Sequence, residues 1–257
     1  GSEMCIRDSA GTADTRVFCE VTQLGKELEK IGSRVMGSEN HAKVGIIFDW
    51  ENYWALEYTS GPNRDLRYVD QIEQMYNYFY NKNIAVDMIP IDADFSKYDL
   101  VAAPVLYMVK DGVAESLEAY VQAGGTLITT YMSGIVGQSD NVHLGGYPGP
   151  LRKMAGVWVE EIDALAPEQR NKIRFADGTE EECRLVCDLM HLEGAEEIAQ
   201  YENDFYAGMT AVAKNQFGKG TVYYVGTDLS ESGLAKVLAM AADGAAIQPV
   251  IGEATAL

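Results

Sequence analysis

The 257-residue chain is short of positive charge, of cysteine and of long apolar runs. Lys and Arg number 20 against 39 Asp and Glu, so the net charge of −19 repels nucleic-acid phosphates and anionic membrane surfaces. No apolar run approaches the ~20 residues that span a bilayer. Four cysteines in a chain of this length do not form a disulfide scaffold, which favours a reducing compartment. We therefore expect no nucleic-acid partner and no membrane partner.

The chain also lacks the motifs of common catalytic sites. Ser133 follows an apolar run, but Tyr131 and Met132 precede it where a nucleophile elbow needs small neighbours. No cysteine lies at the end of such a run, which argues against a Cys-His-Glu triad. His41 and His143 have no neighbouring Ser, Cys or paired carboxylate, and we interpret them as surface histidines. We expect no catalytic residue.

The spacing of Cys183, Cys187 and His191 invites comparison with a metal site. These positions, together with Leu185 and Leu189, would all fall on one face of a strand. A buried free cysteine packs like a small hydrophobic residue, and tetrahedral zinc needs a fourth ligand that is not close in sequence. The pattern favours a core face, so we predict no metal site and no cofactor.

Two segments at the start stand apart from the rest. Residues 1–13, GSEMCIRDSAGTA, show no periodicity, and we interpret them as a foreign tail. Apolar residues then recur at helical spacing until Gly32, and a polar stretch follows. We expect residues 14–41 to be the last helix of a preceding domain and its linker.

From Lys43 onward, apolar runs alternate with amphipathic helical patterns. A parallel sheet covered on both faces is typical of this alternation, so we predict a three-layer, doubly wound, mostly parallel α/β fold. We expect Asp111 to cap the second helix of this region. A hairpin turn is predicted at 217–220. The expected strands are 44–48, 84–89, 100–105 and 126–130, then strand-like segments at 184–189, 209–217 and 221–225; the expected helices are 66–79, 113–121 and 234–241.

The remaining signal is aromatic. In KVGIIFDWENYWAL an apolar strand leads into a segment that we interpret as a loop. Tyr and Trp offer large contact areas with a polar group, and protein interfaces favour them. This segment follows the carboxyl end of a parallel strand, where such sheets present functional groups. We therefore take as candidates for an interface or a cleft wall Trp50, Glu51, Asn52, Tyr53 and Trp54.

Five segments between Ala42 and Asp243 form a recognisable set: VGIIFDWENYWALE, DADFSKYDLVAAPVLYMV, YVQAGGTLITTYMSGIV, HLGGYPGPLRKMAGVWVEEIDAL and GKGTVYYVGTDL. In these segments, their order and their spacing the chain resembles the middle, trimerisation domain of bacterial β-galactosidases of glycoside hydrolase family 42. The resemblance implies a class I glutamine amidotransferase-like fold without the triad over residues 42–245. It also implies that 246–257 lead to an absent β-sandwich domain, and TRVFCEVTQLGKEL resembles the end of the family's catalytic (β/α)8 barrel.

This resemblance implies a non-catalytic oligomerisation domain whose partners are its own copies in a homotrimer, the family's barrel and a β-galactoside substrate. Retaining hydrolysis needs two carboxyl groups about 5–5.5 Å apart, which the family supplies from the barrel, one of them after an Asn. This sequence contains no Asn-Glu pair. The family and the cysteine content imply a cytoplasmic protein. A free-standing amidotransferase-like ligand-binding or enzyme domain and a carbohydrate-binding module are the alternatives.

Overall fold

A computed structural model of the chain describes residues 13–59 and 61–250. Its contacts divide the chain into two units, Gly1–His41 and Ala42–Leu257. In the first unit, Thr15 caps α2 (Arg16–Val35) by accepting a hydrogen bond from the Phe18 N–H. Within this described helix no residue is buried, and a stripe of apolar side chains from Val17 to Val35 stays exposed. The interpreted foreign tail, 1–13, lies almost wholly outside the described residues.

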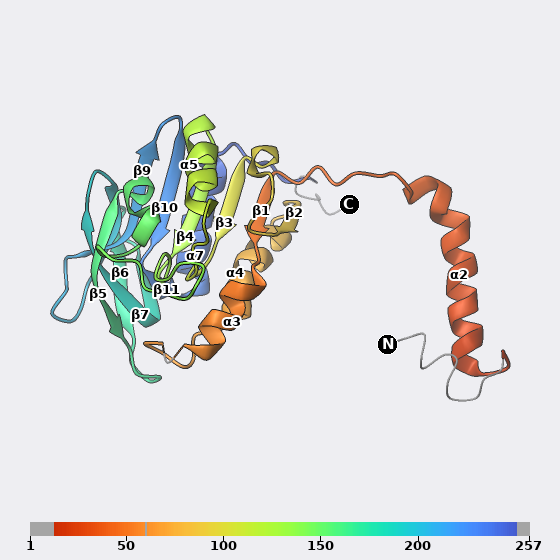
Figure 1. Ribbon diagram of the computed structural model, residues 1–257, viewed down its shortest axis with the longest axis horizontal. Coiled ribbons are helices and arrows are strands. Elements are labelled where there is room, and N and C mark those ends of the chain that lie inside the picture. Colours follow the sequence, from red (N-terminus) through yellow and green to blue (C-terminus); the bar gives the residue numbers. More distant parts are fainter. Residues whose placement is uncertain (1–12, 60, 251–257) are drawn as a thin grey trace. The chain divides into compact units, whose positions relative to one another are not determined.

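Five parallel strands form one half of the sheet in the second unit. They lie in the order β2-β1-β3-β4-β10 (Figure 1). Their interior strands β1, β3 and β4 are buried along their whole length, as a sheet covered on both faces requires. Their bounds are β1 (Val44–Ile47), β2 (Val86–Ile89), β3 (Leu100–Ala103), β4 (Thr126–Thr130) and β10 (Gly220–Val225).

Beyond β10 the sheet is antiparallel. The hairpin at 217–220 is present and joins β9 to β10, with Gly218 in the left-handed conformation that such a turn needs. The α/β class is therefore confirmed, but the sheet is mixed rather than mostly parallel. Polar residues alternate with apolar ones in β6, as in a sheet with one exposed face. The added strands are β5 (Val157–Ala164), β6 (Asn171–Phe175), β7 (Glu180–Leu192), β8 (Glu196–Tyr201), β9 (Thr210–Phe217) and β11 (Thr227–Leu229).

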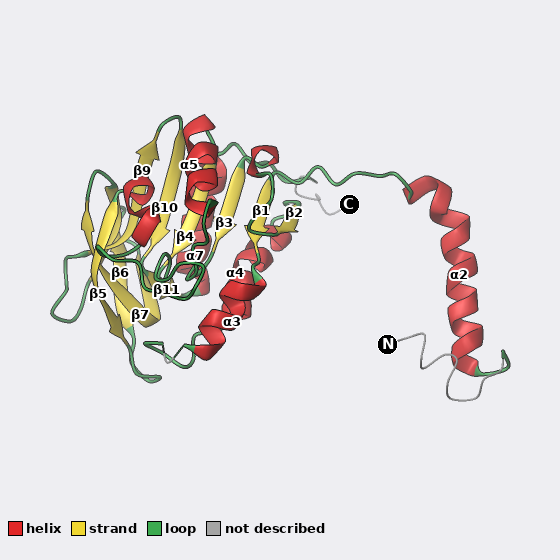
Figure 2. Ribbon diagram, in the orientation of Figure 1, coloured by secondary structure: helices red, strands yellow, loops and turns green. Residues whose placement is uncertain are grey.

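Helices cover both faces of the sheet (Figure 2). On one face α4 (Tyr68–Asn81) and α7 (Glu231–Gly244) bury residues such as Phe79 and Leu238 in one apolar core. On the other, α5 (Val113–Ala123) and the short α6 (Arg152–Ala155) bury Leu117 and Met154 in a second core. The sheet is thus the middle of three layers. The remaining elements of the described residues are helix α3 (Trp50–Tyr58) and two 3-10 turns, η1 (Phe95–Lys97) and η2 (Gly149–Leu151).

The start of α5 differs from the expectation that Asp111 caps it. Gly112 stands at the cap position with a φ of 83°, so the cap residue has no side chain that could accept a hydrogen bond from the first turn. A left-handed backbone at this point suits glycine, and it turns the preceding residue away from the helix. The predicted cap at Asp111 was wrong.

In the second unit, ordered contacts continue past the end of α7. Ile247 is buried against the α4–α7 face, and the Val250 N–H donates a hydrogen bond to the Asn83 carbonyl at 2.8 Å. Among the described helices none is both long enough and apolar enough to cross a membrane.

Candidate functional site

The aromatic segment after β1 is a helix, not the loop that its composition suggested. The Asp49 carboxylate accepts a hydrogen bond from the Asn52 N–H at 3.1 Å and so caps the first turn of α3. Glu51 adds negative charge to that turn, which favours the helix dipole. An aspartate directly before a run without Gly or Pro is a helix-start signal, so the sequence did contain the information.

As a helix, this segment separates its residues by face. Trp50 and Trp54 lie four residues apart with ring centroids 6.1 Å apart, and they are 59% and 52% exposed. Tyr58, a further four residues along, is 90% exposed. Asn52 is fully buried, and Tyr53 is half-buried against Phe48 and Tyr68. The five predicted residues therefore lie on one helix, but some of them face solvent and others face the core.

Asn52 fastens α3 to the loop that follows β3. Its amide nitrogen donates to the Val105 carbonyl at 3.0 Å, and its amide oxygen accepts from the Met108 N–H at 2.8 Å. Val105 has a φ of 46°, which a β-branched residue adopts only when its surroundings impose it. One buried side chain thus satisfies two backbone groups of an irregular loop, which makes Asn52 a structural residue.

Lys110 forms a second attachment between the same two segments. Its ammonium bonds Asp49 Oδ1 at 2.8 Å and also pairs with Glu51. Burial opposes the lysine charge, but the hydrogen bonds to Asp49 and Glu51 outweigh it and raise the pKa of Lys110. Next to this cluster, burial raises the pKa of the Tyr68 hydroxyl to about 12, and that hydroxyl accepts from the Asp49 N–H. The carboxylates of Asp49 and Glu51 thus hold α3 in place through their bonds with Lys110.

The tight turn after β4 has a residue in the left-handed conformation, as a nucleophile elbow does, and that residue is Met132. Met132 has a φ of 58° and is buried. Ser133 is fully buried; its Oγ accepts from the Leu106 N–H at 3.0 Å and lies 2.8 Å from Thr129 Oγ1. In a hydrolase elbow the residue at the strained position is the one whose nucleophile is presented to the site. Here that residue is a methionine, and the serine beside it ties β4 to the loop after β3.

The Cys183–His191 segment is part of β7, but its five positions do not share a face as predicted. Leu185 has a φ of 65°, which interrupts the alternation of side chains along the strand. Cys183, Cys187 and Leu189 are buried, whereas His191 is exposed, bonds Glu160 at 2.7 Å and stacks on the Trp158 ring. Across the described ranges, no three His, Cys, Asp or Glu side chains gather as metal ligands would.

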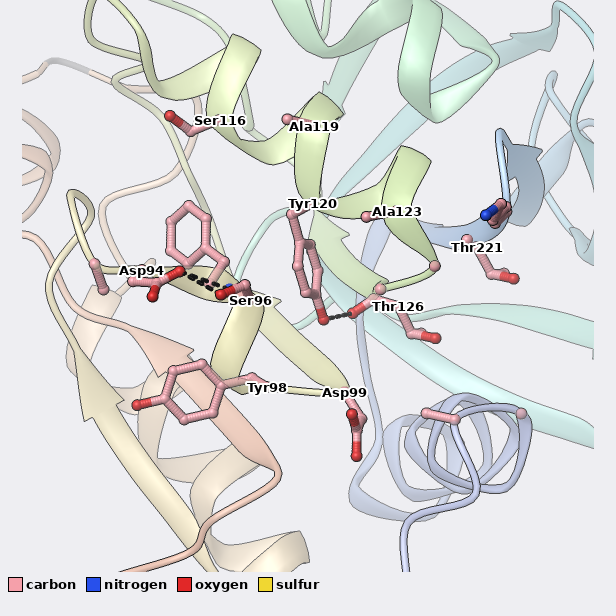
Figure 3. A pocket seen from close by; sticks show the side chains of 18 of the residues that line it. Asp94, Ser96, Tyr98, Asp99, Ser116, Ala119, Tyr120, Ala123, Thr126 and Thr221 are labelled. Atoms are coloured by element: carbon pink, nitrogen blue, oxygen red, sulfur yellow. Dashed lines mark hydrogen bonds between the residues drawn. The ribbon is translucent and has the colours of Figure 1, made fainter.

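A hollow of about 780 Å³ lies at the amino ends of the parallel strands (Figure 3). Its polar side chains bond their own neighbours: the Tyr120 hydroxyl donates to the Thr126 carbonyl at 3.1 Å, and Asp94 accepts from Ser96. Sheets of this kind bind ligands at the carboxyl ends of their strands, which is the opposite edge. We therefore place the candidate site at α3 rather than in this hollow.

The fold and the site together define an α/β domain that carries an exposed aromatic helix at the carboxyl edge of its parallel strands. Residues 42–248 match the family model of the β-galactosidase trimerisation domain, and the chain belongs to that family, which confirms the resemblance seen in the sequence. The related proteins are β-galactosidases of glycoside hydrolase family 42.

Several of these relatives are much longer than the chain. β-Galactosidase LacZ of Lactobacillus acidophilus is 50% identical over 224 residues, which cover 87% of this chain and 33% of that protein. β-Galactosidase BgaP of Planococcus sp. is 45% identical, covering 96% of this chain and 37% of that protein. The crystal structure of a β-galactosidase from Bacillus circulans sp. alkalophilus aligns with a TM-score of 0.87 and 42% identity, over 96% of this chain and 37% of that one. The chain thus spans about a third of the length of its curated relatives.

Proposed function

We propose that this chain is the assembly domain of a longer, cytoplasmic β-galactosidase that works as a homotrimer. The longer protein removes terminal β-linked galactose with retention of configuration, and its two catalytic carboxyl groups lie outside this chain. On this proposal α2 is the last helix of the preceding catalytic barrel, and residues 42–245 have a class I glutamine amidotransferase-like fold without the triad.

The family match over residues 42–248 carries this proposal. Two structural observations support it. The turn after β4 presents no nucleophile at its left-handed position, because Met132 holds that position and Ser133 is fully buried. The exposed aromatic pair on α3 is the kind of surface that protein contacts use, since Trp and Tyr dominate the energetics of interfaces.

The role of α3 follows from its position. Trp50 and Trp54 are more than half exposed, on a helix that Asn52 and Lys110 fasten to the segment after β3. We assign them to contact with the barrel or with a neighbouring subunit, where they help to wall the galactose cleft. Their replacement in the full-length protein would then weaken the trimer or raise the KM for a galactoside.

A turnover assay tests the proposal against its alternative. The 257-residue chain should show no hydrolysis of a chromogenic β-galactoside, whereas the full-length protein hydrolyses it. In the full-length protein, Trp50→Ala with Trp54→Ala should change trimer stability or KM. Unchanged values for both would refute the role of α3, and turnover by the isolated chain that Ser133→Ala abolishes would establish an independent enzyme domain instead.

A further inference from the structure

A bulge in strand β7 brings two buried cysteines together. Cys183 and Cys187 stand four positions apart in β7, yet their partners on β11, Leu229 and Thr227, stand only two positions apart. The two extra residues are accommodated around Leu185, whose φ of 65° is a conformation that costs a leucine about 1–3 kcal/mol. Bulges of this kind re-aim side chains, and here the bulge returns both cysteines to one face of the strand.

The bulge also brings the two cysteines within the reach of a disulfide. At a rise of about 3.3 Å per residue, a spacing of two positions on β11 places the cysteine Cα atoms roughly 6.6 Å apart, whereas four positions of a regular strand would place them about 13 Å apart. Disulfides join Cα atoms that are about 4.4–6.8 Å apart. The irregular backbone at Leu185 is therefore what makes a bond between these two sulfurs geometrically feasible.

The two free thiols already bond each other. The Cys183 S–H donates to the Cys187 sulfur, and the two residues are 1% and 0% exposed. This hydrogen bond lowers the pKa of Cys187 and, together with burial, raises the pKa of Cys183. The thiolate is the reactive form of a cysteine, so Cys187 is the more nucleophilic of the two.

A hollow of about 660 Å³ reaches this pair. It lies between α4, α7 and β7, and Cys183 forms part of its wall together with Tyr78 and Leu234. Hydrogen peroxide is little larger than water, so a hollow of this volume can hold it beside Cys183, whose thiol bonds Cys187. The pair is thus buried from bulk solvent but lies next to a space that a small oxidant can enter.

We propose that Cys187 and Cys183 are an oxidation-sensitive pair that closes to a disulfide when the protein meets a peroxide. The Cys187 thiolate attacks one peroxide oxygen, an S–O bond forms as the O–O bond breaks, and the departing hydroxide takes up a proton as water. The Cys183 sulfur then attacks the Cys187 sulfur, an S–S bond forms as the S–O bond breaks, and a second water leaves. The two sulfurs give up two electrons and two protons in all, and the peroxide accepts them.

The disulfide keeps the oxidation reversible in the core of the domain. A buried cysteine without a partner thiol passes from sulfenic acid to sulfinic acid, which is not reduced by thiols and places a charge among apolar side chains. A disulfide is uncharged, and a thiol reductant opens it again. Strand β7 pairs with β5, β6, β9 and β11, so damage at this point would affect much of the antiparallel half of the sheet.

Peptide mapping tests the proposal on the 257-residue chain with Cys5→Ser and Cys19→Ser, which leaves the pair as its remaining cysteines. After peroxide treatment the protein is alkylated and digested without reductant. Trypsin cleaves after Arg184, between the two cysteines, so the disulfide should link peptide 175–184 to peptide 185–214. Dithiothreitol should separate the two peptides, and the Tm of the oxidised protein should stay within about 2 °C of that of the reduced protein.

Cys183→Ala in the same background is the matched control. Cys187 then has no partner, so peroxide should add two or three oxygen atoms to it and lower the Tm by about 5 °C or more. Oxygen atoms on Cys183 or Cys187 without linked peptides would overturn the proposal. Two unmodified thiols after a treatment that oxidises the exposed Cys19 of the unsubstituted chain would overturn it as well. If the alanine variant does not fold, the peptide map of the parent decides alone, and neither result depends on the proposed assembly role.

Discussion

Replacement of Asn52 by alanine should destabilise the domain far more than its position on an aromatic surface helix suggests. The side chain is fully buried and serves the Val105 carbonyl and the Met108 N–H at 3.0 and 2.8 Å. Its removal leaves both backbone groups buried and unpaired, at about 1–3 kcal/mol each. We therefore expect the free energy of unfolding to fall by about 2–6 kcal/mol, with a decrease in Tm of about 2–4 °C for each kcal/mol lost in a domain of this size.

Urea unfolding followed by tryptophan fluorescence measures this loss, with Tyr58→Ala as the control. Tyr58 lies on the same helix but is 90% exposed, so its replacement should change the free energy of unfolding by less than about 0.5 kcal/mol. Asn52→Asp keeps one acceptor but loses the donor, and should not rescue the variant. A loss below about 1 kcal/mol for Asn52→Ala would refute the claim that this side chain holds α3 to the 105–108 loop.

Three further predictions concern other parts of the structure. Burial raises the pKa of Asp188 to about 8, so the carboxyl group stays protonated in the native state at neutral pH. The free energy of unfolding should therefore decline as the pH rises from about 4 to about 8, because the unfolded chain releases this proton at the lower pH. Asp188→Asn should remove this decline, which unfolding at pH 5 and pH 9 measures. Lys110→Met should lower the free energy of unfolding by about 1–3 kcal/mol, because Asp49 and Glu51 lose their charged partner; a loss no greater than that of an exposed lysine would contradict this. Gly134→Ala should prevent stable folding, since the new Cβ would lie 1.9 Å from the Pro148 carbonyl oxygen. Gly178→Ala, at a residue with a similar φ but open space around it, should lower the free energy of unfolding by only about 1 kcal/mol. Equal Tm values for the two variants would disprove the steric argument.

The sequence predicted those elements whose signal is local. β4 and the β9–β10 hairpin follow their apolar runs and turn glycines, and α4 and α7 follow amphipathic patterns. β2 begins at Val86 rather than at residue 84, because Asn83, with a φ of 56°, turns the chain and the Ile84 N–H bonds the Phe79 carbonyl of α4 instead of a neighbouring strand. The short strands β6 and β8 carry only a weak pattern of polar and apolar residues in sequence, and their pairing with the long neighbours β7 and β9 makes them strands.

The candidate site was predicted in composition but not in structure. Aromatic content drew attention to Trp50 and Trp54, yet it also suggested a loop where Asp49 caps a helix. Once the helix is known, the four-residue spacing puts both tryptophans on one side. The role of Asn52 could not be predicted, because its partners lie more than fifty residues away and exist only when β1 and β3 pair.

The central claim is that this chain is the assembly domain of a longer β-galactosidase that works as a homotrimer. Sedimentation equilibrium of the full-length protein measures its mass without reference to shape. The account predicts a species of three full-length chains that persists on dilution into the micromolar range. A mass of one full-length chain at every concentration, or a mass that grows without limit as filaments do, would contradict it.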